Sequence, residues 1–93
     1  MKTWPFGDPP NVAVFTSKKI IERGDWSQRA THDAEDGAWR FHSPGGAAES
    51  EALIVSLEEI TRMNPTVLFL ANLPLGGCAW RETKAGPWNR EKL

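Results

Sequence analysis

The stretch THDAEDGAWRFH, residues 31–42, decides the fold, and the rest of the chain is arranged around it. Residues 33–37 hold three acids and a glycine, which is the composition of a turn. In the WRFH that follows, residues 39–42, large aromatic side chains alternate with polar ones, as in a half-buried strand. We therefore expect an acidic turn that leads into a strand anchored in the core by its aromatic side chains.

The segment before the turn predicts a partner strand. We expect strands over residues 26–32 and 38–43, paired with each other across the acidic turn. One register pairs His32 with Ala38, and a register shifted by one residue pairs Ala30 with Trp39. We expect the shifted register, because it gathers four apolar side chains on one face of the hairpin. These four are Trp26, Ala30, Trp39 and Phe41.

The N-terminal part of the chain predicts an arm, a strand and a short helix. Residues 1–11 hold three of the seven prolines and predict an extended arm that docks on the body of the protein. Residues 12–16 are rich in β-branched and aromatic side chains and predict a strand. A brief helix should follow over residues 18–23, capped by Ser17 and closed by Gly24.

The C-terminal part predicts alternating strands and helices. A flexible loop over residues 44–51 leads into the apolar run 52–57, which has the composition of a central strand buried on both faces. Ser56 and Glu59 match a capping box, so a helix should cover about residues 57–63. The remaining expected elements are a helix over 66–73 opened by Asn64-Pro65, a strand over 78–82 and an edge strand over 88–91.

Together these elements predict one domain over residues 1–93 with an α+β fold. We expect a mixed or mostly antiparallel sheet of four to six strands, with two or three short helices in a single layer on one face. The five tryptophans should supply much of the buried area, since each can bury on the order of 200 Å². The single cysteine, Cys78, excludes an internal disulfide.

The charge balance excludes two classes of partner. Twelve acids and eleven bases give a formal net charge of −1. Proteins that bind nucleic acid or membrane surfaces show a basic excess, so we expect neither partner. Arginines next to tryptophans, as in Trp80-Arg81, should make cation–π contacts within the fold instead of clamping bases. With no apolar stretch typical of a signal peptide or a membrane span, we expect a cytoplasmic protein without a cofactor.

The turn also offers His32, Asp33, Glu35 and Asp36 as potential metal ligands within five residues. Their spacing lacks the alternating acids of a calcium loop, and one local histidine is too few for a zinc site. His42 does not complete a zinc site, because the expected register places it on the opposite face from His32. We therefore expect no metal site and interpret the turn as a solvated acidic segment.

Two functional hypotheses remain. The first is a non-enzymatic protein-interaction module, since an acidic face suits a basic partner and arginine is enriched at binding hot spots. Its expected contact residues are Asp33, Glu35, Asp36 and Arg40. The alternative is a small enzyme with Cys78 as its nucleophile or with acid–base chemistry in the turn. The turn residues involved would be His32, Asp33 and Asp36. We expect the first hypothesis, because no catalytic signature surrounds the cysteine.

Several segments together resemble a family of small uncharacterised bacterial proteins with a domain of unknown function. The hallmark of that family is an Asp-x-Gly-Trp-x-Phe-like motif after a charged turn, and here Asp36-Gly37-Ala38-Trp39 places the glycine one position earlier. The family is similar to a group described as immunity proteins of bacterial toxin systems. The resemblance implies a bacterial protein with an immunity-like role, whose partner would be a basic protein such as a toxin. The segments that carry it are 14–24, 33–41, 54–60, 64–67 and 73–76.

Overall fold

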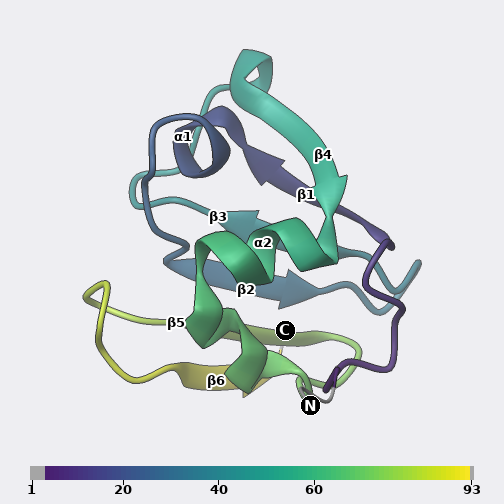
Figure 1. The fold of residues 1–93 in the computed structure, drawn as a ribbon. Helices are drawn as coiled ribbons and strands as arrows, with labels where there is room; N and C mark the ends of the chain where they lie inside the picture. Colours follow the sequence, from purple (N-terminus) through teal and green to yellow (C-terminus); the bar gives the residue numbers. More distant parts are fainter. Residues whose placement is uncertain (1–3, 93) are drawn as a thin grey trace.

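The computed structural model describes residues 4–92, which form a six-stranded sheet (Figure 1). In the sheet the strands follow the order β4-β1-β3-β2-β5-β6. The β1–β3 pair is parallel, and the other four neighbouring pairs are antiparallel. The strands are β1 (Ala13–Ser17), β2 (Arg29–His32), β3 (Trp39–His42), β4 (Ala52–Ser56), β5 (Gly77–Trp80) and β6 (Asn89–Lys92).

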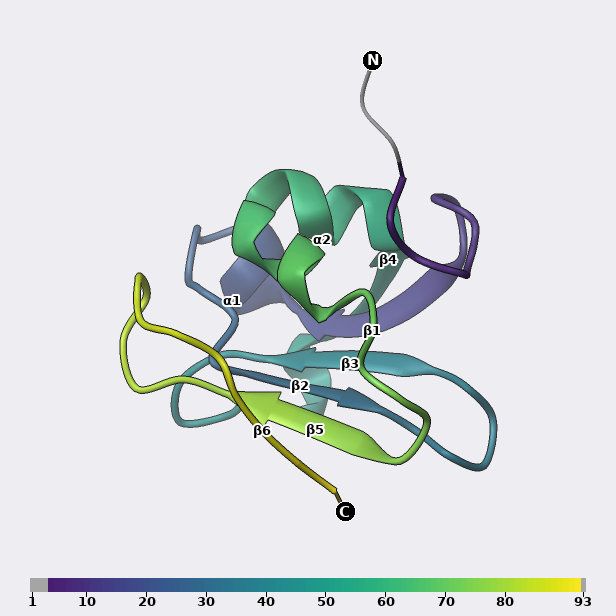
Figure 2. The same cartoon turned by 90° about the horizontal axis from the view of Figure 1, so that it is seen from below.

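One layer of short helices lies on a single face of this sheet (Figure 2). The opposite face, called the bare face below, is covered in part by the loop around residues 47–49. The helices are α1 (Lys18–Ile21), α2 (Leu57–Met63) and the 3-10 helix η2 (Pro65–Leu70), with the single turn η1 (Glu49–Glu51) before β4. The predicted α+β fold, with a mostly antiparallel sheet and a few short helices, is confirmed. None of the described helices has the length and apolar content needed to cross a bilayer.

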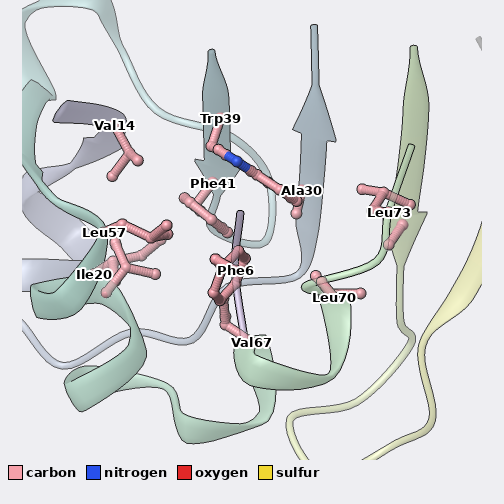
Figure 3. Packing of buried hydrophobic residues seen from close by; sticks show 12 residues of the cluster. Phe6, Val14, Ile20, Ala30, Trp39, Phe41, Leu57, Val67, Leu70 and Leu73 are labelled. Atoms are coloured by element: carbon pink, nitrogen blue, oxygen red, sulfur yellow. The ribbon is translucent and has the colours of Figure 1, made fainter. Parts of the chain in front are cut away.

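Trp39 belongs to the core cluster and lies on the face of β3 that the helices cover (Figure 3). Its side chain is 2% exposed, stacks with Phe41 and meets Phe6 edge-on at 5.4 Å between ring centroids. Phe6 comes from the N-terminal arm and is itself buried. The indole Nε1 of Trp39 also donates to Asp8 Oδ2 at 3.1 Å. The expected docking of the arm is therefore confirmed from residue 4 onward, while residues 1–3 lie outside the described part of the chain.

The hairpin of β2 and β3 forms around the predicted turn, but the expected register is wrong. Ala30 pairs with Phe41, and His32 pairs with Trp39. The difference arises in the turn, because Gly37 adopts a left-handed conformation (φ 71°) and Asp33 N donates to Ala38 O at 2.8 Å. These features lengthen the loop and move the register by two residues. A two-residue shift keeps each side chain on its face, so the predicted clustering of Ala30, Trp39 and Phe41 survives.

The apolar run 52–57 contains a strand, as predicted, but its predicted central position is wrong. β4 is at one edge of the sheet and pairs with β1 alone (Figure 1). The cause is the parallel pairing of β1 with β3, which puts β1 in the inner position and leaves β4 with a single neighbour. Ile54, at the centre of β4, is consequently 62% exposed.

The helix after β4 is the most accurately predicted element. α2 covers residues 57–63, and Ser56 Oγ accepts the expected capping bond from Glu59 N at 3.1 Å. The next expected helix is wrong in type and length, because η2 is a 3-10 helix that ends at Leu70. Asn64 does not cap it, since the Asn64 Oδ1 atom accepts a hydrogen bond from Ser27 N at 3.2 Å. Ser17 likewise forms no capping bond with α1, which is shorter than expected.

The position of Trp39 predicts a large effect of truncating it. Trp39→Ala should lower the free energy of unfolding by about 3–5 kcal/mol, because it opens a cavity under the N-terminal arm and leaves the Asp8 carboxylate without its donor. A domain of this size is stable by roughly 5–15 kcal/mol, so urea denaturation should show the loss clearly. The matched control is Trp80→Ala, since Trp80 is half-buried on the bare face and should cost less. Equal losses in the two variants would contradict this description of the core.

Candidate functional site

The acidic turn is closed by backbone hydrogen bonds and by one side chain, that of Asp36. Asp36 Oδ1 accepts a hydrogen bond from Ala38 N at 2.9 Å, and Gly37 N donates to Asp33 O at 2.9 Å. Of the three carboxylates, those of Glu35 and Asp36 are exposed, and that of Asp33 is half-buried. The structure therefore places all three acids together, but one of them is committed to caps within the turn and another faces the sheet.

Arg40 is brought to this turn by an ion pair. Its Nε lies 2.7 Å from Asp33 Oδ2, and its guanidinium carbon lies 4.4 Å from the centroid of the Phe15 ring. Ion pairs between partly exposed groups typically contribute about 0–1 kcal/mol, so the pair fixes orientation more than it stabilises the fold. Of the four predicted contact residues, Asp33 and Arg40 therefore form an ion pair with each other. The other two, Glu35 and Asp36, are exposed acids.

The two histidines lie on opposite faces of the sheet, as predicted. His32 faces the core, where its ring stacks on Trp39 at 4.0 Å and its Nδ1 lies 2.8 Å from Leu73 O. His42 is exposed on the bare face. Partial burial lowers the pKa of His42, and the guanidinium groups of Arg29 and Arg40 lower it further. No group of three or more potential metal ligands occurs within residues 4–92.

Cys78 is fully buried, in the middle of β5. Burial raises the pKa of its thiol, so the reactive thiolate is disfavoured at neutral pH. The cross-strand neighbours of Cys78 are Thr31 and Glu91. The second catalytic candidate, His32, is held between an aromatic ring and a backbone carbonyl on the other face. The structure therefore does not bring the cysteine and the histidine–acid turn together.

The predicted arginine–tryptophan contact within the fold is confirmed for Arg81. Its guanidinium carbon lies 4.2 Å from the centroid of the Trp88 ring and 5.5 Å from that of Trp26. The side chain is 1% exposed, donates to Ser27 O at 2.9 Å and contacts Thr66 Oγ1. Burial lowers the pKa of Arg81, and these neutral acceptors together with the aromatic faces compensate the buried charge.

The feature that the sequence interpretation missed is the edge formed by β4. Edge strands are normally protected by charged side chains, proline or bulges, because unpaired backbone groups invite further strands. β6, the opposite edge, follows that rule with the sequence NREK, whereas β4 reads ALIVS and carries neither a charge nor a proline. The exposed side chain of Ile54 lies beside Phe15, which is 37% exposed.

A signal for this edge is present in the sequence on either side of the strand. Residues 49–59 contain four acids and no base: Glu49, Glu51, Glu58 and Glu59. A strand buried in the centre of a sheet seldom begins and ends among so many carboxylates, because these would have to reach solvent around its neighbours. The apolar run alone did not distinguish a central strand from an edge strand, but its acidic flanks favour the edge.

The buried position of Cys78 predicts low chemical reactivity. Iodoacetamide should alkylate Cys78 in the folded protein at least about a hundredfold more slowly than in the urea-unfolded protein, because reaction requires local opening of the sheet. Mass spectrometry of quenched samples measures both rates. A rate in the folded protein equal to that in the unfolded protein would show an accessible thiol and would revive the cysteine-dependent enzyme hypothesis.

Comparison with known proteins assigns this chain to no family. No protein-family model, no curated protein and no solved structure matches the chain. The resemblance of its segments to small bacterial proteins therefore stays a prediction.

Proposed function

We propose that this chain is a non-enzymatic protein-interaction module that binds an extended segment of a partner protein along β4. The observation that carries the proposal is an uncharged, apolar strand at the edge of the sheet, with Ile54 62% exposed at its centre. Extended segments commonly add to such edges, where main-chain hydrogen bonds supply affinity and alternate side chains supply specificity.

The outer edge of β4 presents backbone N–H and C=O groups that an added strand can pair with. Leu57 N donates to Val12 O at 2.9 Å, which marks these two residues as a hydrogen-bonded pair of the antiparallel ladder. Because hydrogen-bonded and non-bonded pairs alternate, Val55 bonds to β1, while the N–H and C=O of Ile54 point away from it. The C=O of Ala52 and the N–H of Ser56 point the same way. These four groups form a row that an incoming strand can pair.

The charges around β4 favour a basic partner over a second copy of the chain. Two exposed arginines pair with the flanking acids, Arg23 with Glu51 and Arg62 with Glu58 and Glu59, at 3.1–3.5 Å. Such exposed pairs are weak, and the acids outnumber these arginines. Antiparallel pairing of β4 with itself around Ile54 would bring the acidic flanks of the two copies together. A segment with basic residues on either side of an apolar centre is therefore the complementary occupant.

An immunity-like role follows if the partner is a basic toxin, as the resemblance implies. The exposed carboxylates of Glu35 and Asp36 add to the acidic surface that such a partner would meet. Arg40 is less suited to anchor a protein partner than expected, since Asp33 occupies its Nε and the ring of Phe15 covers one face of its guanidinium. The enzyme alternative gains no support from geometry, because Cys78 is buried and His32 lies on the opposite face of the sheet.

The proposal predicts binding of a designed strand. A short peptide of alternating valine and threonine with lysines at both ends should shift the amide resonances of β4, and its affinity should fall with added salt. The same peptide with glutamates at both ends should bind at least about tenfold more weakly. Equal binding of the two peptides, or shifts confined to other parts of the sheet, would contradict the proposed edge.

Two substitutions of one residue separate backbone recognition from side-chain recognition. Ile54→Pro removes the outward N–H without touching the ladder to β1, and proline is tolerated at such an edge position. It should weaken binding of the lysine-flanked peptide at least about tenfold, whereas the matched control Ile54→Thr, which keeps the N–H, should change the affinity by less than about threefold. Thermal unfolding checks that both variants are folded. Binding by a folded Ile54→Pro variant as tight as by wild type would exclude strand addition.

A further inference from the structure

A separate hollow of about 210 Å³ opens on the bare face of the sheet. β1 contributes Phe15 and Ser17 to its lining, β3 contributes Arg40 and His42, and the loop before η1 contributes Ala48. The hollow has room for several waters or for a small organic molecule.

The loop that walls the hollow is held in place by hydrogen bonds. Gly46 O accepts from Lys19 Nζ at 2.9 Å and from Ser43 Oγ at 3.3 Å, and Gly46 N donates to Ser43 O at 3.0 Å. Gly45 and Gly46 both adopt left-handed conformations (φ 76° and 73°), which other residues seldom take. The glycine pair therefore lets the chain fold back over the sheet at this point and form a fixed wall.

Arg40 is oriented before any ligand arrives. Asp33 holds its Nε, and the ring of Phe15 supports one face of the guanidinium plane. Within the described part of the chain, its two Nη atoms form no hydrogen bond. A guanidinium with both Nη groups available is the side chain best suited to pair with a carboxylate through two parallel hydrogen bonds.

Ser17 supplies a second, independent sign of a ligand. Ser17 is only 4% exposed, and its Oγ has no hydrogen-bond partner among residues 4–92. Because β1 and β3 are parallel with Phe15 opposite Arg40, Ser17 lies on the same face as Arg40 and beside His42. A buried hydroxyl without a partner costs free energy, so such groups usually face a water or a ligand.

We infer that this hollow binds a small molecule that joins a carboxylate to a compact apolar group. Arg40 would pair with the carboxylate, and the Ser17 hydroxyl would donate to it. Phe15 and the alanines of the wall would cover the apolar part. Glu49 also borders the hollow, where it is exposed, and would disfavour ligands with a second negative charge. The inference does not depend on strand addition at β4.

His42 gives the site an expected dependence on pH. The charged groups that act on it are Arg29 on β2, Arg40 on its own strand and Asp33 in the turn; the arginines lower its pKa and the aspartate raises it. A bound carboxylate would favour the imidazolium form and so raise the pKa of His42. Protonation of His42 therefore favours binding of the carboxylate ligand, and the affinity for that ligand should increase as the pH falls from about 8 to about 5.

The test is a titration of the protein with benzoate, with phenylacetate as a second carboxylate and benzamide as the neutral match of benzoate. Benzoate and phenylacetate at millimolar concentration should shift the amide resonances of Ser17, Arg40 and Ala48 saturably, and benzamide should bind at least about fivefold more weakly than benzoate. The absence of saturable shifts with both carboxylates, or equal binding of benzoate and benzamide, would overturn the inference. Shifts with inorganic phosphate alone would also overturn it, because they would indicate a different ligand class.

Four variants locate the binding. Ser17→Ala should weaken benzoate binding about threefold to tenfold without lowering the melting temperature, because the hydroxyl it removes has no partner in the protein. Arg40→Gln should weaken it at least about tenfold, whereas Arg29→Gln, which removes the same charge from the same face outside the hollow, should change it by less than about twofold in physiological salt. His42→Gln should abolish the pH dependence. Wild-type affinity in both Ser17→Ala and Arg40→Gln would show that the ligand binds elsewhere.

Discussion

The packing of Trp39 is the interaction on which the rest of the structure depends. Its ring contacts Phe6 from the N-terminal arm, His32 from β2 and Phe41 from its own strand, and its indole N–H bonds to Asp8. One side chain thus joins the N-terminal arm to both strands of the hairpin. Because it fixes which face of β3 is buried, it also fixes which side chains of the neighbouring strands face solvent.

The parts of the fold that local chemistry controls could be predicted from the sequence. The capping bond between Ser56 and Glu59 set the start of α2, and the alternation around Trp39 set the buried face of the hairpin. Features that depend on distant pairing could not be predicted. Asn64 reads as a helix cap, but it bonds to Ser27, which is 37 residues away in the chain. The position of β4 depends on β1 pairing with β3, which the apolar residues of the strand do not report, and only its acidic flanks favour an edge.

The candidate site likewise combines locally visible residues with contacts that depend on distant pairing. The cluster of acids in the turn was visible in the sequence, but the ion pair that neutralises Asp33 depends on the geometry of the hairpin. The hollow beside Ser17 depends on the loop around Gly46 folding back over the sheet. At β4 the sequence and the fold disagree, since a strand with the composition of a sheet interior lies at its edge. Such conflicts between local sequence and global structure commonly mark functional surfaces, because the missing neighbour can be supplied by a partner.

Amide hydrogen exchange in β4 is the most direct measurement of whether this edge is open. The N–H of Ile54 points away from β1, and the N–H of Val55 points toward it. In the isolated protein Ile54 should exchange quickly and Val55 slowly, independently of protein concentration, and a bound extended segment should slow Ile54 alone. Equal protection of both amides in the isolated protein would contradict the open edge. Protection of Ile54 that increases with protein concentration would identify a second copy of the chain, instead of a basic partner, as the occupant.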